Sequence, residues 1–137
     1  MSRNKSLLVL DGQGGGVGRK IAERLIAEAF PYDLIVVGAN AAATSNMMKA
    51  KITAGATGEN AWIYNCLKAD IIVGPIGIIL ANAMHGEISP KMASAVAESE
   101  AQRILIPVPN IHISIAGLTE LSITQYIEEM VEILRRS

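Results

Sequence analysis

An apolar run from Leu7 to Leu10 leads through Asp11 into a glycine-rich turn, and a charged stretch with helical spacing follows. This order of strand, glycine turn and helix restricts the fold more than any other feature of the chain. Glycines are needed where a backbone adopts positive φ or where an anion closely approaches main-chain N–H groups. We therefore predict a phosphate-binding turn at the start of the first helix, formed by Gly12, Gln13, Gly14, Gly15, Gly16, Val17 and Gly18.

Short apolar runs alternate with helix-like stretches along the rest of the chain. Strands are predicted at residues 6–10, 33–38, 71–73 and 103–107. The alternation of isoleucine with other residues at 111–116 predicts a fifth strand, at a sheet edge. Helices are predicted at 17–29, at 40–50, around 62–67, as a short buried piece at 78–84, and after Ser89 and Ser122. Asn40, Ser89 and Ser122 are the expected N-caps, the last within a capping box that ends at Gln125.

Strands separated by helices predict a mostly parallel, five-stranded sheet between two helical layers, which is the Rossmann-like α/β sandwich. The 137 residues suit a single domain. We favour the strand order 2-1-3-4-5, which brings residues 11–12 beside Gly74 and Pro75 at the crevice where the order reverses. The alternative order, 3-2-1-4-5, would place residues 107–108 there instead. Gly74 and Pro75 accordingly join the predicted binding residues.

The amino-acid composition limits which classes of binding partner are plausible. Half of the residues are hydrophobic and the mean hydropathy is +0.34, which fits strands covered on both faces and leaves apolar surface for a homo-oligomer. A net charge of −1 and an aromatic content of 4% argue against a nucleic-acid partner. The most apolar stretch, 71–84, is shorter than the roughly twenty residues that span a membrane, and Asp11 interrupts the first apolar run too early for an export signal. We expect a cytoplasmic protein without a membrane partner, and we interpret the lone Cys66 as a buried, inert thiol.

The spacing of the glycines indicates which type of cofactor-binding loop the turn resembles. The common fingerprint G-x-G-x-x-G does not fit, whereas G-x-x-x-G-x-G fits with Gly12, Gly16 and Gly18. With this spacing the loop resembles the cofactor loop of short-chain dehydrogenases. The resemblance implies NAD or NADP as candidate cofactors and an NAD(P)-linked oxidoreductase as the candidate enzyme class. Those enzymes usually carry Thr where this chain has Asp11, a charge that opposes a phosphate unless it binds loop amides or a cation.

The chain differs from the short-chain dehydrogenases in two further features. A dinucleotide site uses an acidic residue about twenty positions beyond the loop to hold the ribose hydroxyls. Asn40 stands there, so we assign it either to a ribose or adenine contact or to the cap of the next helix. Tyr64 and Lys68 match the spacing Y-x-x-x-K but lie earlier in the chain than the dehydrogenases place that pair. We interpret both as exposed surface residues and assign no catalytic residue.

Several polar residues could serve either a ligand or the fold. Their roles stay open at this stage: Asp11, Glu59, Asn82, Glu87 and Lys91. His85 and His112 are the only imidazoles, and their spacing is not that of a metal site, so no metal is predicted.

Three stretches resemble a small bacterial family of domains of unknown function with a Rossmann-like fold: residues 9–18, 55–60, and 69–77 running on to 86–91. The resemblance covers nearly the whole chain and implies a fold without an activity. Two hypotheses follow. The chain binds a small phosphate-containing ligand, a nucleotide or dinucleotide among them, at the glycine loop. Alternatively it is an oligomeric regulatory or scaffold protein, in which the glycines merely allow the first helix to pack closely on the first strand.

Overall fold

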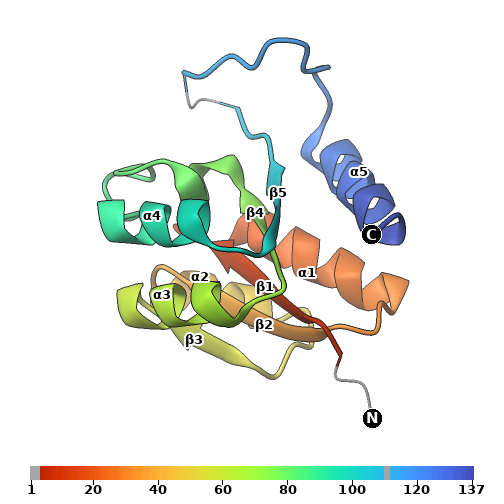
Figure 1. Ribbon diagram of the computed structural model, residues 1–137, viewed down its shortest axis with the longest axis horizontal. Coiled ribbons are helices and arrows are strands. Elements are labelled where there is room, and N and C mark those ends of the chain that lie inside the picture. Colours follow the sequence, from red (N-terminus) through yellow and green to blue (C-terminus); the bar gives the residue numbers. More distant parts are fainter. Residues whose placement is uncertain (1–3, 110–111) are drawn as a thin grey trace.

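The computed structural model describes residues 4–109 and 112–137. Within them, five parallel strands form one sheet with helices on both faces (Figure 1). The strands are β1 (Ser6–Asp11), β2 (Asp33–Gly38), β3 (Gly55–Thr57), β4 (Ile71–Pro75) and β5 (Gln102–Ile106). The helices are α1 (Gly16–Glu28), α2 (Ala41–Met48), α3 (Glu59–Lys68), α4 (Pro90–Glu98) and α5 (Ile123–Arg135), and a 3₁₀ turn, η1 (Ile76–Ile79), follows β4. The predicted α/β class and parallel sheet are confirmed.

The strand order is 3-2-1-4-5, the alternative that the sequence left open. As an order of five strands, the one that we favoured is wrong, because it omitted β3, whose three residues carry little apolar signal, and counted 111–116 as a strand. The four predicted strands that form do lie in the favoured succession, β2-β1-β4-β5. Residues 112–116 do not form a strand, and residue 111 lies outside the described residues. Since β1 pairs with both β2 and β4, the carboxyl end of β1 still lies beside that of β4, where the order reverses.

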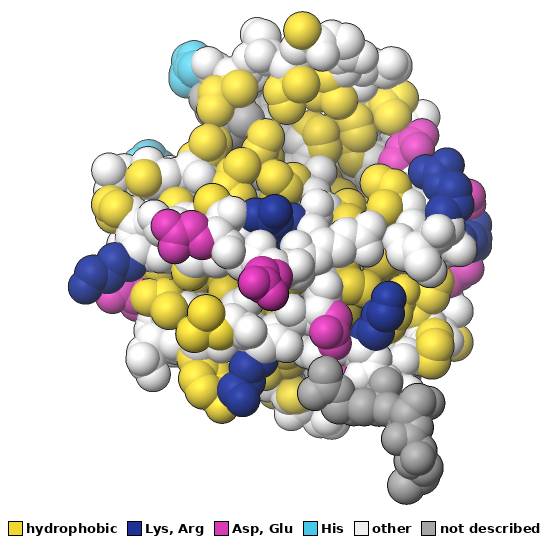
Figure 2. Space-filling view, in the orientation of Figure 1, with side chains coloured by type: hydrophobic (Ala, Val, Ile, Leu, Met, Phe, Trp, Pro, Cys, Tyr) yellow, Lys and Arg dark blue, Asp and Glu magenta, His cyan; other side chains and the backbone are white. Residues whose placement is uncertain are grey.

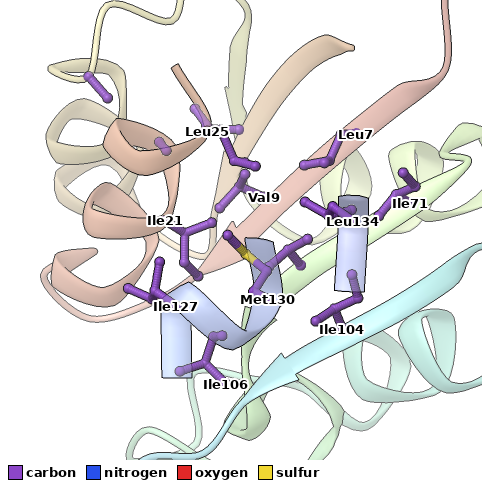
Figure 3. Packing of buried hydrophobic residues seen from close by; sticks show 14 of the residues in the cluster. Leu7, Val9, Ile21, Leu25, Ile71, Ile104, Ile106, Ile127, Met130 and Leu134 are labelled. Carbon is purple, nitrogen blue, oxygen red and sulfur yellow. The ribbon is translucent and has the colours of Figure 1, made fainter. Parts of the chain in front are cut away.

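Two hydrophobic clusters hold the sheet between its helices. On one face α1, α2 and α5 cover the side chains that alternate along the central strands, and on the other α3 and α4 do so. Figure 3 shows how α5 fits into the first cluster, with Ile127, Met130 and Leu134 directed at the sheet. Their spacing places them on one helical stripe, and burying each side chain stabilises the fold by about 1.5–3 kcal/mol.

The predicted helix starts are confirmed. Each cap accepts a hydrogen bond from a first-turn amide: Ala43 N to Asn40 Oδ1 (2.9 Å), Met92 N to Ser89 Oγ (3.1 Å) and Gln125 N to Ser122 Oγ (3.1 Å). The capping box is complete, because Gln125 Oε1 also accepts from Ser122 N at 2.9 Å. The cap at position 40 matters most for function, since it fixes α2 at the end of β2, beside the glycine loop.

The helix predicted at 78–84 does not form. The 3₁₀ turn η1 ends at residue 79, and Asn82, Met84 and His85 then adopt φ values of 68°, 58° and 57°, which a right-handed helix cannot contain. The segment 82–87, the crossing loop, is a compact turn in which Gly86 N donates to Asn82 O at 3.0 Å. Among the described residues, no helix is both long and apolar enough to cross a membrane.

Candidate functional site

The glycine loop, residues 12–18, connects β1 to α1. Gly15 N donates to Gly12 O at 2.9 Å and closes a tight turn, and Gly15 then serves as the N-cap of α1 with φ 72°. A Cβ at position 15 would lie 2.6 Å from the carbonyl oxygen of Ala43, so that only glycine combines this φ with this contact. At position 18 a Cβ would lie 2.5 Å from Met47 Sδ. Both glycines therefore serve the packing of α1 and α2.

Asp11 caps the loop from within the fold. The residue is 4% exposed, and its two carboxylate oxygens accept hydrogen bonds from Gly12 N at 2.8 Å and Gly18 N at 2.7 Å. Burial raises the pKa of the Asp11 carboxyl; the two N–H donors act in the opposite direction, and the negative charge of Glu87 adds to the rise. Of the two roles open from the sequence, the contacts favour the loop cap.

A second carboxylate reaches the loop from the crossing loop. Glu87 Oε1 accepts from Gln13 N at 2.6 Å, and its Oε2 accepts from Asn40 Nδ2 at 2.9 Å. The same Asn40 amide nitrogen also donates to Gln13 O at 2.9 Å. Together with the N-cap bond, these contacts commit both polar atoms of the Asn40 side chain to the protein. Asn40 therefore ties the end of β2 to the glycine loop.

Three loop amides remain available. Among the described residues, the N–H groups of Gly14, Gly16 and Val17 have no protein acceptor, whereas the other loop amides do. They lie at the N-terminus of α1, where the helix dipole favours negative charge, and the first turn of α1 carries no acidic residue. A Cβ at position 14 or 16 would meet nothing within 4 Å. Unlike positions 15 and 18, these two glycines have no packing reason within the chain.

A cavity of about 600 Å³ opens beside this loop. Most of the predicted binding residues line it: Gly12, Gln13, Gly14, Gly15, Gly16, Val17 and Pro75. Gly18, Asn40 and Gly74 are not among the described residues that line it. Gly74 is buried against β1, where a Cβ would lie 2.4 Å from the carbonyl oxygen of Leu10. Glycine at this position therefore lets β4 lie close to β1.

Some cavity residues were not among the predicted binding residues, and one of them, Val108, was expected there only under the alternative strand order. Met84 and His85 of the crossing loop, and Val108 and Pro109 after β5, also line the cavity. Glu87 is not among the described residues that line the cavity, although it binds Gln13 N, which belongs to a lining residue. No local pattern connects these residues to the glycine loop, because contacts across more than sixty positions depend on the finished sheet.

The comparisons with known proteins agree with this architecture. A family model described as "Domain of unknown function (DUF3842)" matches residues 6–137. The chain belongs to this family. The predicted resemblance to a family of unknown function with a Rossmann-like fold is thereby confirmed. No curated protein matches the chain.

Two solved structures are similar in fold. An FMN-dependent cysteine decarboxylase, TvaF from thioviridamide biosynthesis, superposes with a TM-score of 0.52 at 17% identity, covering 98% of this chain and 86% of the other. A lactate dehydrogenase, MGS-M5 from a Medee basin deep-sea metagenome library, gives a TM-score of 0.45 at 17% identity, covering 77% of this chain and 38% of the other. At this identity the first match supports the fold alone.

The remaining predicted side chains lie away from the loop. Tyr64 is 54% exposed on α3, with the Lys68 ammonium 5.0 Å from its ring centre, as expected for a surface pair. Glu59 accepts a hydrogen bond from Ser89 Oγ at 2.6 Å and joins α3 to the start of α4. Lys91 is exposed. The described residues contain no cluster of three or more acidic, histidine or cysteine side chains that could hold a metal.

Cys66 lies in the second hydrophobic cluster, against the α4 side of the sheet. It is a free thiol, 1% exposed, and burial raises its pKa to about 12. The interpretation as a buried, inert thiol is consistent with these values.

Proposed function

We propose that this protein binds a phosphate-bearing ligand, a nucleotide or dinucleotide, with a phosphate group on the amides of Gly14, Gly16 and Val17. One observation carries the proposal: three N–H groups without protein acceptors lie together at a helix N-terminus, on the wall of a cavity of about 600 Å³. Such an arrangement favours an oxyanion both by hydrogen bonding and by the helix dipole.

The pattern of glycines supports ligand binding over a purely structural loop. If the loop only allowed α1 to pack on β1, glycine would be needed at positions 15 and 18, where a Cβ meets the chain. That hypothesis leaves Gly14 and Gly16 unexplained, since both are exposed and have open space around the missing Cβ. A ligand that approaches the backbone closely accounts for them.

Three ligand classes fit this proposal. NAD and NADP follow from the resemblance of the loop to that of short-chain dehydrogenases. Flavin mononucleotide follows from the FMN-dependent decarboxylase with a similar fold. All three carry a phosphate for the loop and an aromatic ring system for the apolar wall near Pro75, Val108 and Pro109.

The test is Gly16→Asp. An aspartate at the first position of α1 adds a negative charge where the phosphate would bind. The same charge interacts favourably with the helix dipole and stabilises the helix by about 0.3–1 kcal/mol. The variant should therefore fold at least as well as the wild type and lose ligand affinity by about tenfold or more. Thr124→Asp is the matched control, because it adds the same charge to the exposed first turn of α5.

Binding is measured by thermal shift and calorimetry with NAD⁺, NADP⁺, FMN, ADP and pyrophosphate. A ligand at about 100 times its Kd should stabilise the wild type and the Thr124→Asp variant by about 2.7 kcal/mol. Equal shifts in the Gly16→Asp variant, or no shift with any of these compounds, would contradict the proposal.

We also propose that the protein is a homo-oligomer, and cytoplasmic, as the sequence predicts. Support for the oligomer comes from the arm, residues 112–121, which stands away from the sheet (Figure 1). Its Ile113, Ile115 and Leu118 are 44–47% exposed, and Figure 2 shows hydrophobic side chains gathered below the arm. A second cavity of about 330 Å³ lies there between β5 and α5. Contiguous apolar surface of this kind is typical of subunit interfaces.

A further inference from the structure

Asn40 stands at the end of β2, where dinucleotide sites of this fold carry an acidic residue. In sheets of this order, a carboxylate at that place accepts hydrogen bonds from the ribose hydroxyls. Asn40 cannot replace it: its Oδ1 accepts from Ala43 N, and its Nδ2 is a donor already shared between Gln13 O and Glu87 Oε2. A ribose diol is held best by a charged acceptor, and the neutral Asn40 oxygen, which already accepts from Ala43 N, is a weaker acceptor than a carboxylate.

Another carboxylate occupies the place. Glu87 comes from the crossing loop, 47 positions after Asn40, and brings its Oε2 to within 2.9 Å of the Asn40 amide. Its Oε1 lies 2.5 Å from the position that a Cβ of Gly12 would take, on the side where Ala39 also approaches. Hence the carboxylate lies between the first glycine of the loop and the end of β2.

We propose that Glu87 is the ribose-binding acid of this site, and that the protein selects nucleotides with a free 2′,3′-diol. The inference rests on the proposed binding of a phosphate ligand at the glycine loop. It adds recognition of the ribose, which the loop amides do not contact in the proposed complex.

The geometry leaves Glu87 able to bind a diol. A carboxylate has about four acceptor positions, and the bonds from Gln13 N and Asn40 Nδ2 use two. The residue is partly exposed, and its Oε1 lies against Gly12 and Gln13, two residues that line the cavity. Its backbone is held as well, because Glu87 N donates to Met84 O at 3.1 Å. An acceptor fixed in this way loses little freedom when it binds a ligand.

Charge makes the same site selective. No Lys or Arg among the described residues forms an ion pair with Glu87. The nearby Asp11 carboxyl adds negative potential rather than compensating for it. A 2′-phosphate placed here would meet a carboxylate without a cation, so NAD⁺ should bind more tightly than NADP⁺.

The experiment compares ligands that differ only at the ribose. Calorimetry with ADP and 2′-deoxy-ADP is carried out on the wild type, Glu87→Gln and the control Glu98→Gln, which removes an exposed acid at the end of α4. The wild type and the control should bind ADP about tenfold or more tightly than 2′-deoxy-ADP, as expected for one hydrogen bond to a charged group. Glu87→Gln should bind the two ligands about equally, and NAD⁺ and NADP⁺ should likewise become similar.

The ratio separates a ribose contact from a structural role. If Glu87 only stabilised the loop, its loss would weaken both ligands equally and leave the ratio unchanged, which would overturn the inference. Tighter binding of every ligand by Glu87→Gln would also overturn it, since the carboxylate would then be an obstacle to the phosphate. Pyrophosphate tests the loop alone: if it binds while the wild type does not distinguish the two ADP ligands, the ribose inference fails and the phosphate proposal stands.

Discussion

Gly74→Ala should remove about 1–3.5 kcal/mol from the free energy of unfolding. The added methyl group would lie 2.4 Å from the carbonyl oxygen of Leu10 and 2.9 Å from Ile78 Cδ1, well inside the distances that real Cβ atoms show. The first obstacle is backbone of a neighbouring central strand, so it cannot turn aside as a flexible side chain could. Overpacking of this kind costs about 1–3 kcal/mol, and a weakened hydrogen bond in the β1–β4 ladder adds about 1 kcal/mol. Restriction of the unfolded chain by alanine returns about 0.4–1 kcal/mol.

Gly14→Ala is the matched comparison, because its Cβ meets nothing within 4 Å. Where the backbone conformation suits alanine, the same restriction of the unfolded chain should make this variant neutral or slightly more stable. Urea unfolding followed by circular dichroism gives both free energies, and the slope with denaturant shows whether the unfolding remains comparable. A loss below about 1 kcal/mol for Gly74→Ala, or an equal loss for both variants, would refute the close approach of β4 to β1.

Two further predictions concern the surface arm and the thiol. The double variant Ile113→Asp, Ile115→Asp should lower the molar mass measured by light scattering to that of a single chain. The control Leu67→Asp, at an 80% exposed position on α3, should leave the molar mass unchanged. A wild type that is already monomeric at high concentration would rule the arm out as an interface. Cys66 has a pKa of about 12 in the folded protein, so the reactive thiolate is scarce at pH 8, and iodoacetamide should label it only after denaturant is added; rapid labelling of the native protein would contradict its burial.

Local chemistry was enough to predict most of the fold. The strands at β1, β2, β4 and β5 and the caps at Asn40, Ser89 and Ser122 follow from short-range patterns that the structure retains. β3 was missed because three residues, Gly55–Thr57, are too few to show a period. The alternating isoleucines after residue 110 suggested a strand, but residues 112–116 have no neighbouring strand to pair with in the described chain.

Of the candidate site, only the glycine loop and Pro75 could be predicted from the sequence. The glycine spacing located the loop, and the parallel order placed Pro75 beside it. The contacts of Glu87 with Gln13 and Asn40 depend on a turn with three successive left-handed residues, Met84, His85 and Gly86, only the last of which is glycine. Left-handed conformations at ordinary residues are uncommon, and tertiary contacts rather than sequence select them.

The internal capping of the glycine loop affects how any ligand would be received. Asp11 and Glu87 already bind three of its amides, and Asn46 Nδ2 holds the carbonyl of Gly14 at 3.0 Å. The conformational entropy of this segment is thus lost when the chain folds and not during association. The loop is therefore preorganised, and we expect a ligand to bind quickly with little movement of the main chain.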